Sequence, residues 1–501
     1  MRDRNYLMKV LGLSGVPKLA TFALSLTTIP IVLRSVGAAQ YGTFLYVGAA
    51  VSIFEVLIDF GVSSAGGRRL AELRVSRPWA LRSEILAWAR LQATFLAGGF
   101  VPMLLIAHAV LDAGRTESAT SLLAVVSATL GVNVVLNFCR PCLQSLLAFK
   151  SMTVLDTSQS VLRSLAFLAA VQFMPNALGL AIAGLSTAAV AAALAVLLLV
   201  QRLREQGVSN DERAPITTTR ERLRLSGAFL WLRISTRLFL EMPLLLIGRF
   251  LGPDLVGIIG AFLRVSEIIN TPYLIVGNAL MVRVNEISER GRQSMASLWE
   301  AALRIVSTAI CMAVLFHLAA PLLGKMLLPR VADAPEAFSL LAPLIFTVSL
   351  SGVLAPMSDY LGALTRRNTA LSVMALVQVP VLMLSITWWG AVGALGAYVV
   401  TQMTLSVVYF LLAQRIFSGA CVSVVRREVT GFSLCCAVSL VLTRMVYLSA
   451  AAWLKPLALL PPSWLAMVPL VLFSVFLVIG LGTMRSSWRY YFRSDFFDFT
   501  R

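Results

Sequence analysis

The segment Arg34-Ser-Val-Gly37-Ala-Ala-Gln-Tyr-Gly42 returns 215 residues later as Arg249-Phe-Leu-Gly252-Pro-Asp-Leu-Val-Gly257. The arginine and both glycines match in type and spacing, and each segment follows a long apolar run. Further anchors recur at nearly the same shift in equivalent loops: Gly179 with Gly393, Lys150 with Arg367, and Gln201-Arg202 with Gln414-Arg415. Together these matches indicate an internal duplication.

The composition around the repeats is that of a membrane protein. Of the 501 residues, 58% are hydrophobic and 13% are charged, whereas about 25% of the residues of a soluble domain are charged. This excludes a soluble globular enzyme, a coiled coil and a disordered chain. Apolar runs long enough to cross a bilayer as helices fall at roughly 9–33, 43–67, 85–111, 119–140, 151–173, 177–201, 225–251, 255–282, 298–324, 336–362, 368–389, 391–414, 429–450 and 463–483. The sequence therefore predicts an all-α polytopic membrane protein with about 14 transmembrane helices.

Basic residues alternate between the loops in a way that predicts the orientation of the helices. The N-terminus, every even-numbered loop and the C-terminal tail are basic, whereas the odd-numbered loops are short and nearly neutral. The positive-inside rule therefore places both termini in the cytoplasm. This topology accounts for most of the net charge of +18, so we expect no nucleic-acid partner.

The number of spans in each repeat decides how the two halves are related. Six is an even number, so both halves enter from the same side and the pseudo-twofold axis runs along the membrane normal. We expect two six-helix parallel repeats around a central cleft, plus two accessory helices. The predicted divisions are an N-lobe at 1–207, a cytoplasmic linker at 208–224, a C-lobe at 225–418, and the accessory spans with a basic tail at 419–501.

Ionisable residues inside the spans are candidates for a functional site. Each costs about 2.5–3.5 kcal/mol on insertion, so such residues generally face a cavity or a partner. The duplication places Lys18 and Arg233 at the same depth in the two halves, where two cations repel each other unless an anion lies between them. The anion is expected to be a substrate head group, unless both side chains extend to the inner interface instead. Arg140, Arg237 and Arg264 are further candidate cations.

Carboxylates accompany these cations. Glu55 and Asp59 lie one turn apart in the second span, while Glu241 and Glu267 follow arginines by four and three residues. The carboxylates either form ion pairs, within one helix or across helices, or carry a coupling proton or sodium ion. The chain has only two histidines, which are far apart, so we expect no metal site and no cofactor.

Four stretches of the sequence resemble a known family. Arg34-Ser-Val-Gly37-Ala-Ala-Gln-Tyr41-Gly42-Thr-Phe, Asp59-Phe-Gly61-Val-Ser and Arg68-Arg69 resemble the start of the O-antigen and polysaccharide flippases, and Gly248-Arg-Phe-Leu-Gly252-Pro-Asp-Leu-Val-Gly257 resembles their second-lobe counterpart. These flippases belong to the multidrug/oligosaccharidyl-lipid/polysaccharide exporter superfamily. The resemblance extends over roughly 9–417 in helix count, repeat and loop charge.

The resemblance implies a transporter and no enzyme. A polyprenyl-diphosphate-linked oligosaccharide would cross from the inner to the outer leaflet of the bacterial cytoplasmic (inner) membrane by alternating access, for exopolysaccharide or O-antigen biosynthesis. Lys18, Arg233, Arg237 and Arg264 would bind the diphosphate. Expected partners are this glycan, membrane lipids, a polysaccharide polymerase and the chain-length machinery.

The sequence leaves two alternative functions. The protein would be either a drug/cation antiporter of the same superfamily or a peptidoglycan lipid-precursor flippase. A drug/cation antiporter should have an acidic cavity, and the first span here carries a cation and no acid. A membrane glycosyltransferase would need a carboxylate or histidine cluster on a sizeable loop, which the sequence lacks. The G-x-x-x-x-G-K-[ST] motif of ATPases is also absent, so ion gradients, the membrane potential or removal of product would drive transport.

Overall fold

A computed structural model describes residues 28–111, 117–146, 148–205, 217–267, 334–360 and 364–417, together with positions 24, 270, 309, 313, 316, 317 and 320. Within these residues all regular structure is helical, which confirms the predicted all-α polytopic membrane fold. Lys18, spans 13 and 14 and the C-terminal tail lie outside the described residues. Five described segments are long and apolar enough to cross a membrane: Ala38–Asp59, Thr120–Ser145, Ala177–Glu205, Ala337–Leu354 and Thr365–Ala413.

The chain forms two compact units. One consists of Val16–Ala261 and Leu371–Ala394, and the other of Met1–Gly15, Phe262–Ala370 and Leu395–Arg501. We call the first the site unit. The predicted division into lobes at 207 and 225 stays a prediction.

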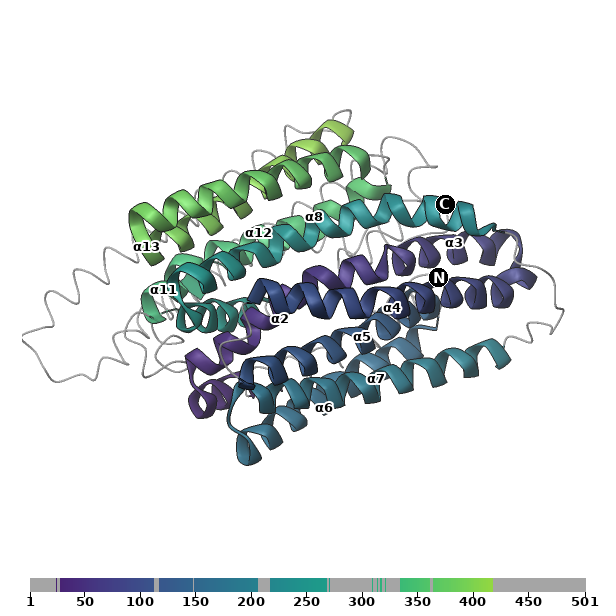
Figure 1. Ribbon diagram of the computed structural model, residues 1–501. Helices are drawn as coiled ribbons and strands as arrows, with labels where there is room; N and C mark the ends of the chain where they lie inside the picture. Colours follow the sequence, from purple (N-terminus) through teal and green to yellow (C-terminus); the bar gives the residue numbers. More distant parts are fainter. Residues whose placement is uncertain are drawn as a thin grey trace, which may run out of the picture. The chain divides into compact units, whose positions relative to one another are not determined.

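Most described helices belong to the site unit. They are α2 (Ala38–Asp59), α3 (Val62–Ser76), the 3-10 turn η1 (Pro78–Ala80), α4 (Leu81–Leu111), α5 (Glu117–Ser145), α6 (Phe149–Phe173), α7 (Ala177–Glu205) and α8 (Thr219–Leu251). The second unit holds α11 (Ala334–Leu341) and α12 (Pro343–Tyr360), and α13 (Leu364–Phe417) contributes residues to both. In the site unit, α2 and α3 follow one another along α8, while α5, α6 and α7 pack together (Figure 1).

The second predicted span is broken in its middle. Phe60 and Gly61 both adopt left-handed backbone conformations, with φ of 48° and 71°, so α2 ends and α3 begins within one apolar run. Gln92 of α4 donates a hydrogen bond of 3.3 Å to the carbonyl of Ile58, which satisfies part of the backbone that the break frees. A Cβ at Gly61 would lie 2.4 Å from the carbonyl oxygen of Ser226 on α8. This position therefore requires glycine both for its φ angle and for close packing.

The helix α8 begins earlier than the predicted span at 225–251. Thr218 is its N-cap, and the Thr218 hydroxyl accepts a hydrogen bond of 3.2 Å from the backbone N–H of Glu221. Such a cap stabilises the first turn, so the end of the segment expected to be linker is helical from Thr219 onward.

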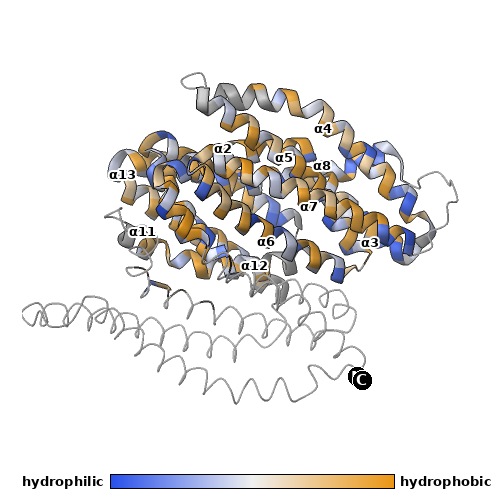
Figure 2. Cartoon of the chain, turned by 90° about the horizontal axis from the view of Figure 1, so that it is seen from below, coloured by the Kyte–Doolittle hydropathy of each residue, from blue (hydrophilic) through white to orange (hydrophobic). Residues whose placement is uncertain are grey.

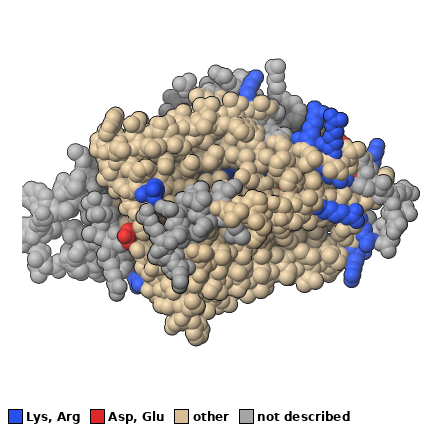
Figure 3. Space-filling view, in the orientation of Figure 1, with Lys and Arg blue, Asp and Glu red and all other residues tan. Residues whose placement is uncertain are grey.

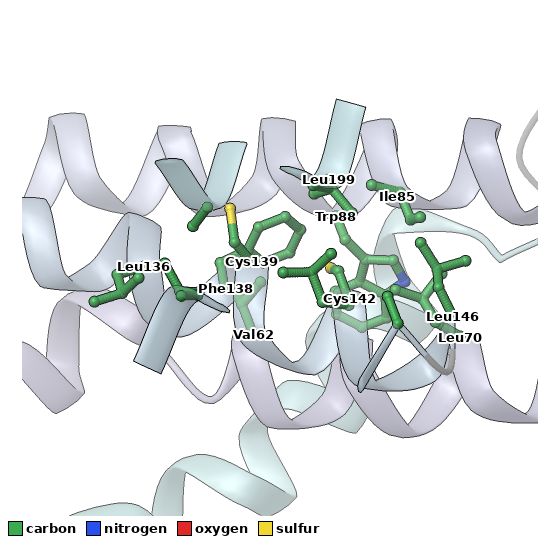
Figure 4. Close-up of a cluster of buried hydrophobic side chains, with 14 of the residues drawn as sticks. Val62, Leu70, Ile85, Trp88, Leu136, Phe138, Cys139, Cys142, Leu146 and Leu199 are labelled. Atoms are coloured by element: carbon green, nitrogen blue, oxygen red, sulfur yellow. The ribbon is translucent and has the colours of Figure 1, made fainter. Parts of the chain in front are cut away.

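A hydrophobic core joins α3, α4, α5, α6 and α7. Trp88 is fully buried at its centre and is surrounded by aliphatic side chains (Figure 4). Cys139 and Cys142 are free, buried thiols in this core, where cysteine acts as a small apolar side chain. This core holds α5 and α6 in place, and both helices carry polar groups of the site described below.

Charge is concentrated at one end of the site unit. Lysine and arginine side chains gather where α3 ends and α8 begins (Figure 3), and Figure 2 shows hydrophilic residues where α3 lies. By the positive-inside rule this end is the predicted cytoplasmic end. The exposed arginines there include Arg68, Arg77, Arg204, Arg220 and Arg224.

Candidate functional site

The two carboxylates of α2 lie at the point where the helix breaks. Asp59 is the last residue of α2, and Glu55 precedes it by one turn. Both side chains are buried, with exposed fractions of 1% and 4%. The hydroxyl of Ser63 in α3 donates a hydrogen bond to Asp59 across the break. Ionised carboxylates this deeply buried need counterions, and two arginines of α8 provide them.

Arg233 and Arg237 of α8 pair with these carboxylates across the helix interface. Arg233 forms an ion pair with Asp59. The Nη2 atom of Arg237 lies 3.6 Å from Glu55, and its Nη1 atom donates a hydrogen bond of 3.1 Å to Glu241 on the same helix. The structure therefore shows ion pairing across helices for Glu55 and Asp59, and within one helix for Glu241. A role for these carboxylates in carrying a coupling ion stays a prediction.

Asn137 and Arg140 of α5 extend the polar groups to a third and a fourth helix. Asn137 donates a hydrogen bond of 2.7 Å to Glu55. One turn further along α5, the Nη2 atom of Arg140 donates hydrogen bonds of 3.0 Å to Asp156 and 2.6 Å to Gln159, both on α6. We call these side chains the charged layer: Glu55, Asp59, Asn137, Arg140, Asp156, Gln159, Arg233, Arg237 and Glu241.

The charges of the layer differ in how accessible they are. On the side formed by α2 and α8, Arg233 and Arg237 are 22% and 33% exposed, whereas their partners on α2 are almost fully buried. Glu241 on α8 is 17% exposed, so the guanidinium groups are the most exposed charges on this side. Guanidinium groups bind phosphate oxygens in a bidentate geometry.

The sequence identified some members of the layer and missed others. It singled out Arg140, Arg233, Arg237 and the carboxylates of α2 and α8, and the structure brings them together on the four helices named above. Asn137 and Gln159 were missed because neutral amides carry no charge signal. A polar side chain one turn from Arg140 inside an apolar span was the available hint for Asn137.

Two expected residues belong to the second unit. Arg264 and Glu267 lie three residues apart in the helical residues 253–267, and their side chains pair at 2.9 Å. This is the intrahelical ion pair that their spacing predicts. A role for either residue in substrate binding stays a prediction, as does the role of Lys18. Among the described residues, no group of three histidine, cysteine or acidic side chains is arranged to hold a metal ion.

The long apolar helices define a multi-pass membrane protein. Twenty-five solved chains are similar to this one in structure. They include an inward-facing multidrug resistance MATE family transporter of the MOP superfamily (14% identity, 81% of this chain and 98% of that chain, TM-score 0.63) and the lipid II flippase MurJ in an inward closed conformation (10%, 94% and 99%, 0.60). A third is the Vibrio cholerae MATE transporter VcmN in its bent form (13%, 84% and 99%, 0.53).

The family follows from a direct match. The family described as "Polysaccharide biosynthesis protein" matches residues 10–282, more than half of the chain. The chain therefore belongs to this polysaccharide biosynthesis family, and the predicted resemblance is confirmed. No protein with a curated description matches it.

Proposed function

We propose that the protein moves a polyprenyl-diphosphate-linked oligosaccharide from the inner to the outer leaflet of the bacterial cytoplasmic membrane by alternating access. The observation that carries the proposal is the part-exposed pair Arg233 and Arg237, set against buried carboxylates inside a membrane protein of the polysaccharide biosynthesis family. These guanidinium groups would bind the diphosphate in passage.

The physical barrier that such a substrate faces explains the need for a polar path. Moving an unpaired hydroxyl into hydrocarbon costs several kcal/mol, so an oligosaccharide does not cross the bilayer unaided. A polar path for the head group removes this cost while the polyprenyl chain stays in lipid. An inside-negative potential favours outward movement of the anion by about 2.3 kcal/mol per charge per 100 mV.

Two rival functions share the fold. The MATE neighbours suggest a drug/cation antiporter as one alternative, and the MurJ neighbour suggests a peptidoglycan-precursor flippase as the other. The antiporter needs acidic groups that a cation can reach, whereas here Asp59 and Glu55 are almost fully buried and each pairs with an arginine of α8. The surface glycan of a deletion strain separates the two flippases, since the proposed function requires surface polysaccharide to be lost while the cell wall is kept.

Removing one cation of the pair gives a first prediction. The variant Arg237→Gln should lower export about 10- to 100-fold, because a hydrogen bond to a charged group contributes about 1.5–3 kcal/mol. Arg237→Glu should abolish export, and lipid-linked repeat units should accumulate on the cytoplasmic side. The measurement is analysis of lipid-linked oligosaccharide and surface glycan in cells that produce each variant at equal levels.

Arg202 offers a matched control for this prediction. It is 34% exposed and pairs with Glu205 at 2.7 Å at the end of α7, so it resembles Arg237 in exposure and pairing but lies outside the charged layer. Export by Arg202→Gln should equal that of the wild type. Unchanged surface glycan in Arg237→Glu cells would refute the anion site.

A further inference from the structure

One face of α6 is polar, although this helix lies in the predicted span at 151–173. Like α4 and α8, it is not among the described segments that are apolar enough to cross a membrane by composition alone. Asp156, Gln159, Arg163 and Phe167 follow one another at intervals of three or four residues, so they share one face of α6. The side chain of Asp156 is 41% exposed, and that of its partner Arg140 is 35% exposed. Charged groups inside a membrane generally face a cavity or pair with a partner. Asp156 and Arg140 do pair, but both stay partly exposed, so we infer that this face of α6 meets water.

Two aromatic rings lie at the end of this polar face, one on α6 and one on α2. The guanidinium of Arg163 lies 5.2 Å from the centre of the Phe167 ring. Phe44 of α2 meets that ring edge-on, with the centroids 6.4 Å apart. One turn further along α2, a Cβ added at Gly48 would meet no atom within 4 Å. The polar face of α6 therefore leads to an aromatic pair with open space beside it.

The chemistry of this face suits sugars better than phosphate. Asp156, which pairs with Arg140, is exposed, unlike the buried carboxylates that pair with Arg233 and Arg237, so its negative charge would repel a phosphate group on this face. Carboxylate, amide and guanidinium groups together offer adjacent donors and acceptors for neighbouring hydroxyls. Aromatic rings give an apolar surface for the C–H face of a pyranose. We propose that Asp156, Gln159 and the Phe167 ring on α6 form the subsite for the oligosaccharide.

The position of this subsite fits the order of groups in the substrate, and here the inference rests on the proposed function. In a glycan carried on a polyprenyl diphosphate, the first sugar is bonded directly to the diphosphate. Asn137 touches Glu55, the partner of Arg237, and Arg140 touches the α6 face. These two residues are three positions apart on α5, a rise of about 4.5 Å along the helix. Arg140, a candidate cation of the substrate site, is therefore assigned to the sugar side.

Two lipids separate the sugar subsite from the diphosphate site. One probe is bare polyprenyl diphosphate, and the other is the polyprenyl-diphosphate oligosaccharide fraction extracted from host cells. Affinities for both are measured on the full-length protein in detergent. For Gln159→Ala and Asp156→Asn we expect about tenfold weaker binding of the glycolipid and unchanged binding of the bare lipid. Arg237→Gln should weaken both, and Arg202→Gln neither.

The outcomes distinguish a failure of the sugar subsite from a failure of the proposed function. If Gln159→Ala and Asp156→Asn change the two affinities equally, or change neither, the sugar subsite is wrong although the diphosphate site stands. If the wild type binds neither lipid, or Arg237→Gln alters neither affinity, the proposed function itself fails. Size-exclusion elution and thermal unfolding confirm that each variant is folded, and Gln159→Glu provides a second, isosteric test at the same position.

Discussion

Replacing Gly42 by alanine is expected to reduce transport at least tenfold in a protein that still inserts. A Cβ at this position of α2 would lie 1.8 Å from the carbonyl oxygen of Pro253, and a Cβ at Gly257 would lie 2.1 Å from the carbonyl oxygen of Ala38. Both obstacles are backbone atoms, which cannot rotate away. Overpacking of this kind typically costs about 1–3 kcal/mol, and a backbone obstacle places the cost at the upper end.

The internal repeat explains why the two contacts come as a pair. The shift of 215 residues turns Gly42 into Gly257 and Ala38 into Pro253, so the two contacts are equivalent under the twofold. Gly37 and Gly252, also related by this shift, share one backbone conformation, with φ of 85° and 93°. The repeat-related motifs therefore pack on each other, at the end of α2 that the charge pattern places outside. A side chain there should hold this end open, and Gly257→Ala should have the same effect as Gly42→Ala.

The reactivity of a cysteine introduced at a buried position measures whether the two repeat-related motifs have separated. Ser52 is buried on the face of α2 that carries Glu55 and Asp59, so Ser52→Cys should react slowly with a membrane-impermeant thiol reagent applied from outside. When Gly42→Ala is added to Ser52→Cys, the reaction should become at least tenfold faster than in Ser52→Cys alone, after the background labelling of the wild-type chain is subtracted. The control is Gly227→Ala on α8, where a Cβ meets no atom within 4 Å. Equal labelling in the Gly42 and Gly227 variants would show that a side chain at position 42 does not hold this end of α2 open.

Features that depend on one segment were predictable, and those that depend on how two helices meet were not. The helical pairs Arg237–Glu241 and Arg264–Glu267 follow from spacing, because one helix fixes the distance between residues three or four apart. The partner of Arg233 depends on how α2 and α8 are turned toward each other. Repeat symmetry directed attention to Lys18 as a second cation, whereas the counterion in the structure is Asp59.

The break between α2 and α3 shows a second limit of the sequence. Phe60 and Gly61 lie within an apolar run, so hydropathy predicts one continuous span. Glycine allows a left-handed backbone but does not require it. What fixes the break is the close approach of α8 to Gly61 and the hydrogen bond from Gln92, and both come from residues distant in sequence.

Glu84 and Arg222 show the same limit at the end of the site unit where α8 begins. Glu84 directly precedes the predicted span at 85–111 and Arg222 lies within the predicted linker at 208–224. The two residues are 138 positions apart, yet they form a buried ion pair between α4 and the first turn of α8. Glu84 is fully buried and Arg222 is 6% exposed, with 3.4 Å between the guanidinium and the carboxylate. The backbone N–H of Thr217 donates a hydrogen bond of 2.5 Å to the same carboxylate.

Removing the arginine of this pair is expected to have the largest effect on stability. The variant Arg222→Met leaves a fully buried carboxylate whose remaining partner is the N–H of Thr217, and breaking a buried pair in this way costs about 3–5 kcal/mol. It also removes a hydrogen bond of 2.6 Å from Arg222 to the carbonyl of Thr217 and the guanidinium that lies 5.9 Å from the Trp88 ring. Thermal unfolding in detergent, with denaturant unfolding for the free energy, measures the loss.

A second substitution shows that the loss arises from the unpaired charge. Adding Glu84→Leu to Arg222→Met removes the stranded carboxylate, and an apolar replacement of a buried pair is often neutral or stabilising, so most of the lost stability should return. The matched control is Arg68→Met on α3, because Arg68 and Glu72 pair at 3.3 Å with 66% and 49% of their side chains exposed. An exposed pair contributes about 0–1 kcal/mol. If Arg222→Met unfolds at the same temperature as Arg68→Met, the pair does not anchor α8 to α4. If the double variant is no more stable than Arg222→Met alone, the loss comes from the missing Thr217 and Trp88 contacts and not from the buried charge.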